Sequence, residues 1–214
     1  MTISVFLVDD HRVLRDGLRI LLETQDDIKV VGEAEDGNKA IEGITSLKPD
    51  VAVMDITMPE LNGIESAQII HESLPDIGIV ILSIHSDLEH IFRALQAGAQ
   101  GYLLKESAGS EVISAVRAVH LGRRYLSPSI RDTVMEAYMQ NRRIQSPLEL
   151  LSMREREVLQ LTAEGNSSAA IGERMGLSPK TVETYRSRLM GKLGVRDLPE
   201  LVRFAIKHGI TPLD

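Results

Sequence analysis

Three acidic residues, each placed just after a short apolar segment, have the type and spacing that chemistry at a shared site would need. Asp9 and Asp10 follow the apolar segment 5–8, and Asp55 follows the segment 51–54. Short apolar segments of this kind are typical of strands buried on both faces of a parallel sheet. Since ligands bind beyond the carboxyl ends of parallel strands, we expect the three carboxylates to share one crevice.

Two further polar side chains follow predicted strands. Ser83 comes after the apolar segment 77–82, and Lys105 comes after 102–104. Three close carboxylates repel one another and need a counter-charge, which a divalent metal supplies; all-oxygen ligands favour Mg²⁺. With an ammonium and a hydroxyl beside the metal, the site suits a phosphoryl group. Asp55 is then predicted to be the acceptor, which forms an acyl phosphate.

The elements that position these residues alternate along the first half of the chain. The predicted strands cover 5–8, 28–32, 51–54, 77–82 and 102–104. The predicted helices between and after them cover 14–22, 36–47, 64–74, 87–97 and 108–121. Ser86-x-x-Glu89 predicts a capping box at the fourth of these helices. This alternation predicts an α/β domain with a doubly wound, five-stranded parallel sheet.

Charge divides the chain into two unlike halves. Its formal net charge is −7, but residues 1–125 contain 20 acidic and 11 basic residues, whereas residues 126–214 contain 11 acidic and 13 basic residues. Within 178–196 the single acid is Glu183, against five bases. This asymmetry predicts two domains with different partners. The chain has no Cys, which excludes disulfides and thiol chemistry.

The second half predicts a bundle of helices. Ser152-Met153-Arg154-Glu155 has the capping-box pattern, and the helix that it opens ends near Gly165. A second helix ends at Gly176, and Ser178-Pro179 is typical of a helix start. Two helices separated by a glycine are the outline of a helix-turn-helix unit, an outline that many helical hairpins share.

The helix predicted over 179–193 has an apolar and a polar face. At about 100° per residue, the apolar face consists of Val182, Tyr185, Leu189 and Leu193. The opposite face consists of Lys180, Glu183, Thr184, Ser187, Arg188 and Gly191. Its small and polar residues allow close approach to a groove of DNA, and neighbouring bases can contact phosphates.

A set of motifs in the first half has a specific joint spacing: Asp9-Asp10, Asp55-x-x-Met58-Pro59-x-x-Asn62-Gly63, Ser83, Gly98-Ala99-x-Gly101-Tyr102 and Lys105. These motifs resemble the receiver domain of bacterial two-component response regulators. The resemblance implies that a sensor histidine kinase phosphorylates Asp55. It also implies that Asp10, Asp55 and the backbone of Thr57 contact Mg²⁺, and that Asp9 holds metal-bound water.

The same resemblance assigns roles to the remaining receiver residues. Lys105 would pair with the phosphoryl group, Ser83 would move toward it, and Tyr102 would swing inward behind it. Thr57 and His85 lie two positions after Asp55 and Ser83. We hypothesise that these two residues gate the attacking water and set the lifetime of the phosphoryl group.

A second set of motifs lies in the second half: Leu151-Ser152-x-Arg154-Glu155-x-Glu157-Val158-Leu159, Ser178-x-Lys180-Thr181-Val182-x-x-Tyr185-Arg186-Ser187 and Lys192-Leu193-Gly194-Val195. These motifs resemble the LuxR-type helix-turn-helix, and the two domains together resemble the NarL/FixJ class of response regulators. The resemblance implies that Glu183, Thr184 and Ser187 face base edges of double-stranded DNA. The other DNA contacts that it implies are Lys180, Thr181, Arg186, Arg188 and Lys192.

Two further features bear on DNA binding. Ser168-Ala169-Ala170 stands where the family usually has Asn-Lys-Glu, which removes a common positive contact. The final amphipathic helix, predicted over 197–208, resembles the family's dimer contact; packing onto its own domain is the alternative.

The sequence therefore predicts a receiver domain over 1–125, a linker with a helix over 126–149 and a DNA-binding domain over 150–214. The linker contains a flexible connector near 141–149. We expect a cytoplasmic, Mg²⁺-dependent transcription regulator, since no segment approaches a membrane span. Phosphorylation would uncover the recognition helix from the receiver and promote a homodimer.

Two alternatives remain open from the residues. One is a DNA-binding regulator whose receiver is structural and works without phosphorylation. The other is an aspartyl-phosphate phosphatase, which would want a second carboxylate where Thr57 stands. No nucleotide-binding glycine motif occurs, and the six His show no ligand spacing, so we expect no enzyme.

Overall fold

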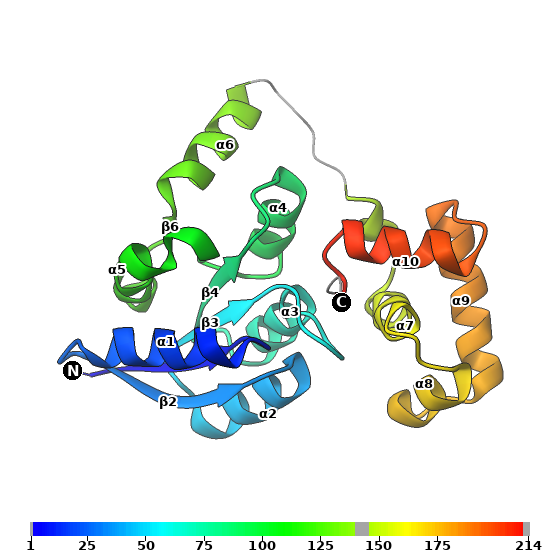
Figure 1. Ribbon diagram of the computed structural model, residues 1–214, viewed down its shortest axis with the longest axis horizontal. Coiled ribbons are helices and arrows are strands. Elements are labelled where there is room, and N and C mark those ends of the chain that lie inside the picture. Colours follow the sequence, from blue (N-terminus) through cyan, green and yellow to red (C-terminus); the bar gives the residue numbers. More distant parts are fainter. Residues whose placement is uncertain (1, 140–145, 212–214) are drawn as a thin grey trace. The chain divides into compact units, whose positions relative to one another are not determined.

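The chain forms two compact units, Met1–Ile144 and Gln145–Asp214, each with its own hydrophobic core (Figure 1). A computed structural model describes residues 2–139 and 146–211. The expected connector near 141–149 falls partly on residues 140–145, outside the described residues.

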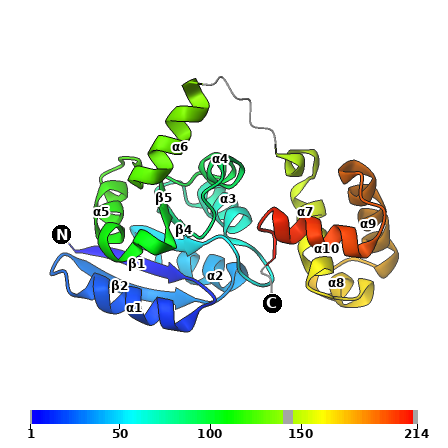
Figure 2. The ribbon, with the colours of Figure 1, turned by 45° about the horizontal axis from the view of Figure 1, so that its top comes forward.

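A parallel sheet is the centre of the first unit (Figure 2). Its strands, in the spatial order β2-β1-β3-β4-β5-β6, are β1 (Ile3–Val8), β2 (Ile28–Ala34), β3 (Val51–Asp55), β4 (Gly78–Ser83), β5 (Gly101–Leu104) and β6 (Tyr125–Leu126). Every neighbouring pair is parallel, and Asp55 pairs with Leu82 while Ser83 pairs with Leu104. The chemistry-bearing residues therefore gather at one edge, as the strand order requires.

The predicted doubly wound sheet is confirmed, but the strand count is wrong. The prediction had five strands, and the structure adds β6, which pairs with Gly101 and Tyr102 of β5. A strand of two residues cannot display an alternating or continuous apolar pattern, so no sequence signal marks it.

Helices cover both faces of the sheet. They are α1 (Arg12–Glu23), α2 (Gly37–Leu47), α3 (Gly63–Ser73), α4 (Leu88–Gln96), α5 (Ala108–His120) and α6 (Pro128–Met139), with a 3₁₀ turn η1 (Lys105–Ser107). One core contains Leu22 of α1 and Val116 of α5; the other contains Ile44 of α2, Ile70 of α3 and Ile91 of α4. The sheet is thus enclosed on both faces, which explains its nearly uniform apolar strands.

The helix expected in the linker belongs to the first unit. α6 packs against α4 and β5, and its Ile130 is fully buried. The compact unit therefore extends well beyond residue 125, because an apolar face of α6 completes the core on this side.

The predicted capping box at Ser86 is wrong. Asp87 caps α4 instead, and its carboxylate accepts a hydrogen bond from the backbone N–H of His90. An aspartate is as good a cap as a serine, and it stands next to the first helical residue here.

Between residues 146 and 211, four helices and a 3₁₀ turn build the second unit: η2 (Pro147–Leu150), α7 (Met153–Ala163), α8 (Ser168–Met175), α9 (Pro179–Leu193) and α10 (Leu198–Lys207). The predicted capping box between Ser152 and Glu155 is present, and the Ser178 side chain caps α9. Val182 and Leu189 of α9 are buried against the other helices, so the predicted apolar face is the packed one.

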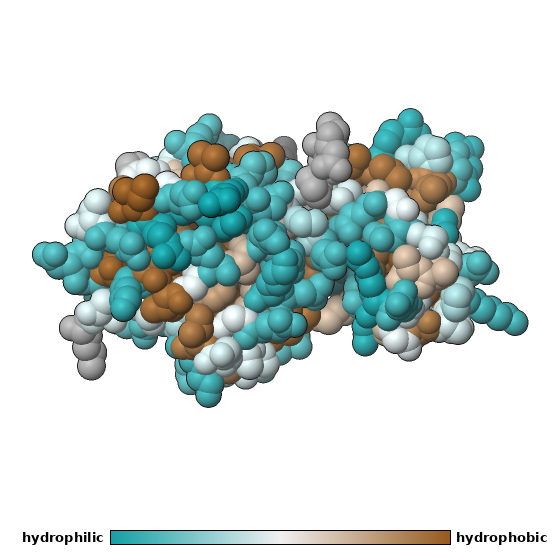
Figure 3. Space-filling model, turned by 60° about the horizontal axis from the view of Figure 1, so that its bottom comes forward, coloured by the Kyte–Doolittle hydropathy of each residue, from teal (hydrophilic) through white to brown (hydrophobic). Residues whose placement is uncertain are grey.

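Apolar side chains are mostly internal in both units. On the face of the described residues drawn in Figure 3, brown apolar areas are small and separated by polar residues. None of the helices in the described residues has the length and apolar character needed to span a membrane.

Candidate functional site

Asp55 and Lys105 form the centre of the acidic crevice at the carboxyl edge of the sheet. Lys105 Nζ lies 2.7 Å from Asp55 Oδ2 and 2.8 Å from Asp9 Oδ2. Both carboxylates are almost fully buried, with side-chain exposures of 3% for Asp9 and 4% for Asp55. One ammonium thus bridges two carboxylates that the ends of β1 and β3 bring together, and one negative charge remains unbalanced.

Burial controls the charge of this centre. Burial raises the pKa of Asp55 to about 6; the Lys105 ammonium opposes this rise, and the Asp9 carboxylate adds to it. Burial alone would lower the pKa of Lys105, but the two carboxylates outweigh burial and raise it. Another positive charge in the crevice would therefore stabilise the Asp55 anion.

A group of four residues could hold a cation here. Asp9, Asp10, His11 and Asp55 each offer a ligand atom, and these atoms lie within 4.8 Å of one another. The donors are mostly carboxylate oxygens, which suit Mg²⁺. His11 was missed by the sequence reasoning; its Nδ1 lies 2.6 Å from Asp10 Oδ1. Its position beside the acidic pair was the available signal.

The loop after β3 packs closely around both the side chain and the backbone of Asp55. The backbone N–H of Ile56 donates to Asp55 Oδ1 at 2.7 Å. Asn62 caps α3 through its side chain, and the next residue, Gly63, packs directly onto Asp55. A Cβ atom on Gly63 would lie 1.8 Å from the Asp55 carbonyl oxygen, so only glycine fits.

Ser83, Tyr102 and His85 form a hydrogen-bonded group beside the crevice. The backbone N–H of His85 donates to Ser83 Oγ at 3.0 Å, and the Tyr102 hydroxyl donates to the His85 carbonyl at 2.8 Å. Tyr102 is fully buried, so its ring already points inward. His85 Nε2 lies 3.3 Å from Thr57 Oγ1, which places both residues of the hypothesised gate side by side.

Helix α9 presents most of the expected DNA contacts to solvent. Exposed residues among them are Lys180, Glu183, Thr184, Ser187, Arg188 and Lys192. Thr181 and Arg186 are partly buried. A shallow hollow at the start of α9 is lined by Ser178, Lys180, Thr181, Thr184, Tyr185 and Arg188. Polar and basic groups therefore share one accessible side of this helix.

Two of the expected contacts also bind within their own unit. Lys192 Nζ lies 2.6 Å from Glu155 Oε2, the carboxylate of the α7 capping box. Arg186 donates to Ser168 Oγ at 3.3 Å. Sequence spacing could not indicate these partners, because α7 and α8 approach α9 only in the folded unit.

Models of two protein families match this chain. The response regulator receiver domain matches residues 5–117, and the bacterial regulatory proteins of the luxR family match residues 149–205. The chain belongs to the NarL/FixJ class of response regulators. It is a DNA-binding transcriptional regulator of this class and not an enzyme, so the phosphatase alternative is set aside.

Relatives of this response regulator match over nearly its whole length. The response regulator UvrY of Escherichia coli K12 is 38% identical over 208 residues, which cover 97% of this chain and 95% of UvrY. A structure of Salmonella typhimurium RcsB is 28% identical with a TM-score of 0.60, covering 95% of this chain and 97% of RcsB. An RcsB–DNA complex is 26% identical with a TM-score of 0.59, covering 95% and 98% of the two chains.

Proposed function

We propose that this response regulator is switched by phosphorylation of Asp55, with a sensor histidine kinase as the phosphoryl donor. The observation that carries the proposal is the buried Asp55 carboxylate paired with Lys105 at 2.7 Å. An Asp55 oxygen would attack phosphorus as the bond from phosphorus to the kinase histidine breaks. Lys105 is already placed to hold an oxygen of the transferred group.

Mg²⁺ is the cofactor that the donor set fits. Asp9, Asp10 and Asp55 would hold it with the backbone of Thr57, Asp9 through bound water. When bound, Mg²⁺ would supply positive charge to the phosphoryl oxygens. The raised pKa of Asp55 and the repulsion between neighbouring carboxylates support a cation at this position.

The phosphoryl group would act through Ser83 and Tyr102. Ser83 would turn its hydroxyl toward the new oxygens, and its present bond from the His85 backbone would then change. Because the Tyr102 hydroxyl is bonded to the His85 carbonyl, a shift of Ser83 would reach Tyr102 through one residue. This connection supports a switch at the start of α4.

DNA binding would use α9 as the recognition helix in the major groove. Glu183, Thr184 and Ser187 would read base edges; Lys180, Thr181, Arg186 and Arg188 would contact phosphates. Lys192 would contribute only when its bond to Glu155 opens. The RcsB–DNA complex among the similar structures supports DNA as the partner.

Phosphorylation would shift a population between two states of the whole chain. In one, the receiver, residues 1–125, covers the recognition helix; in the other, the domain over 150–214 is released by the linker 126–149 and a homodimer binds the operator. The final helix α10 is the candidate dimer contact. We place this cycle in the cytoplasm, where kinase domain and DNA are both accessible.

Two measurements test the proposal. Incubation with a small phosphodonor and Mg²⁺ should add the mass of one phosphoryl group to the wild-type chain and none to Asp55→Asn. Selection from a random pool of DNA duplexes, with and without donor, should return one operator motif more strongly with donor. Phosphorylation without any change in selection would favour the regulator with a structural receiver.

A further inference from the structure

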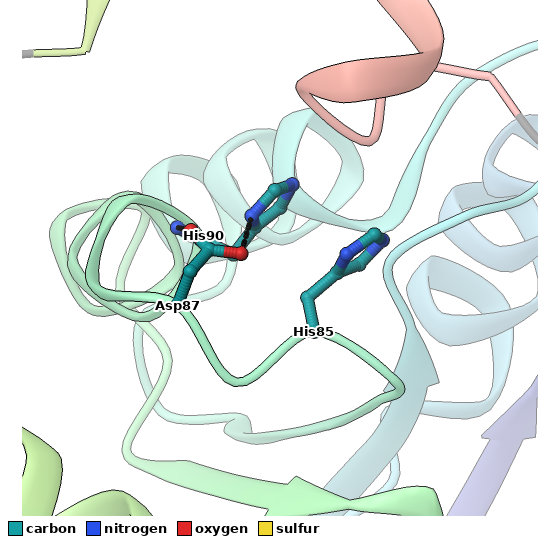
Figure 4. A group of neighbouring side chains, drawn as sticks. All are labelled: His85, Asp87 and His90. Atoms are coloured by element: carbon teal, nitrogen blue, oxygen red, sulfur yellow. Dashed lines mark hydrogen bonds and ion pairs between the residues drawn. The ribbon is translucent and has the colours of Figure 1, made fainter.

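Two of the six histidines come together at the start of α4. His85 lies in the loop between β4 and α4, Asp87 caps α4, and His90 lies in its first turn (Figure 4). Each offers a possible ligand atom, and these atoms lie within 4.8 Å of one another. The sequence reasoning saw no ligand spacing among the histidines, because a loop and a helix together bring these residues close.

The buried side chain of His90 has one ring nitrogen that a metal ion could bind. Its Nδ1 lies 2.7 Å from Asp87 Oδ2, and its side chain is only 2% exposed. Among the described residues, its Nε2 is buried without a hydrogen-bond partner. A buried polar atom left unpaired destabilises the folded state, so a partner for Nε2 would be favourable. In the tautomer whose Nδ1–H donates to Asp87, Nε2 carries the lone pair of the ring.

His85 supplies a second nitrogen beside the first. The two imidazole rings are stacked, with centroids 4.0 Å apart and planes inclined by 6°. Two imidazole nitrogens and one carboxylate are a donor set for a transition metal.

We propose that His85, Asp87 and His90 bind one divalent transition metal ion of the Zn²⁺ type, separately from the acidic crevice. Ligand atoms in a tetrahedral zinc site are about 3.4 Å apart, so the three donors must move closer together. Asp87 would leave His90 Nδ1 and turn its carboxylate toward the ion. Asp87 has a side-chain exposure of 55% and His85 is partly buried, so both have room to rotate and tilt away from the stacked geometry. Solvent can supply the fourth ligand.

The ion would act on the switch residues through His85. This residue bonds to Ser83 through its N–H and to Tyr102 through its carbonyl, and its ring contacts Thr57. Fixing His85 would hold the loop in its present position and slow phosphorylation of Asp55. This consequence rests on the proposed function, whereas metal binding itself does not.

Metal binding is tested on the full chain after treatment with a chelator. Zn²⁺ is titrated by calorimetry and Co²⁺ by visible absorption, both with saturating Mg²⁺ to occupy the acidic crevice and in a His11→Ala background, which removes the imidazole beside that crevice. We expect one ion per chain and a tetrahedral Co²⁺ spectrum. Asp87→Asn preserves the helix cap and should weaken binding by about tenfold to a hundredfold.

His85→Ala should remove the Co²⁺ band, and His120→Ala, which changes a histidine outside the cluster, should leave it unchanged. Binding that His85→Ala and Asp87→Asn both leave intact would overturn the proposal. Asp55→Asn separates the two claims: it should bind Zn²⁺ normally whether or not Asp55 is a phosphoacceptor.

Discussion

Asp55 is a buried carboxylate whose ionisation depends on few neighbours. The Lys105 ammonium forms ion pairs with Asp55 at 2.7 Å and with Asp9 at 2.8 Å. Burial nevertheless raises the pKa of Asp55, so the folded crevice holds a proton on this carboxylate more tightly than the unfolded chain does. The stability of the metal-free protein should reveal this difference.

We predict that Asp55→Asn stabilises the metal-free protein at neutral pH. The pKa of Asp55 rises from 3.8 to about 6 on folding, so folding takes up a proton within this window. The free energy of unfolding therefore falls as pH increases from about 4 to about 6, by at most about 3 kcal/mol. The amide of the variant does not titrate, so the advantage of Asp55→Asn should appear across this window and vanish below it.

Urea unfolding in a chelator at several pH values measures the effect, with the exposed Asp76→Asn as control. A stability difference between wild type and Asp55→Asn that is independent of pH would contradict the assignment of a raised pKa.

The contact between Thr57 and His85 makes a second prediction. Their side chains meet at 3.3 Å, and in our hypothesis they restrict the approach of water to the phosphoryl group. Replacing both with Ala should increase the rate of acyl-phosphate hydrolysis several-fold, since the attacking water gains access. Loss of phosphate from the purified phosphorylated chain measures this rate. An unchanged lifetime would remove both residues from the gate.

The predicted strands and helices located the site residues better than the residue types alone did. The sequence predicted the strand ends and hence the meeting of Asp9, Asp55 and Lys105, because apolar segments of parallel strands are easily recognised. It did not predict β6, whose two residues are too few for a pattern, or the capping of α4 by Asp87. The close approach of Gly63 to Asp55 was visible in the sequence only as a turn signal.

Two glycines on helices allow a matched test of this packing. Gly63→Ala should destabilise the protein by more than about 2 kcal/mol and lower phosphorylation, because its Cβ would collide with the Asp55 carbonyl. Gly17→Ala, in α1, has open space around the new Cβ and should stabilise by about 0.5–1 kcal/mol. Thermal unfolding of both variants decides the matter; equal effects would contradict the crowded geometry at Gly63.

Two basic residues of α9 should have different roles, one in DNA binding and the other in the stability of the second unit. Arg188 is exposed, and Arg188→Gln should weaken DNA binding and reduce the salt dependence by about one phosphate contact. Lys192 is bonded to the nearly buried Glu155, so Lys192→Gln should instead destabilise the second unit by about 1 kcal/mol. Anisotropy titrations at several salt concentrations, with thermal unfolding beside them, distinguish the two variants. A larger salt effect for Lys192→Gln than for Arg188→Gln would reverse these roles.

The whole molecule couples an acidic receiver to a locally basic helix-turn-helix unit. Composition and motif spacing predicted this organisation, because each unit has its own charge and its own periodicity. Contacts between distant segments could not be predicted: the bond of Lys192 to Glu155 and the stacking of His85 on His90 arise only when separate elements pack. The proposed phosphorylation would add charge far along the chain from α9, so its effect on DNA binding would be a shift between states. A complete shift, from 1:99 to 99:1, requires about 5.5 kcal/mol.

The most direct test of this account is the affinity for a selected operator duplex, measured by anisotropy before and after phosphorylation. Wild type with phosphodonor and Mg²⁺ should bind at least about tenfold more tightly, a change of about 1.4 kcal/mol. Asp55→Ala should show no gain under the same conditions. Equal affinity for the unmodified and fully phosphorylated wild type, with phosphorylation verified by mass, would contradict the claim that Asp55 controls DNA binding.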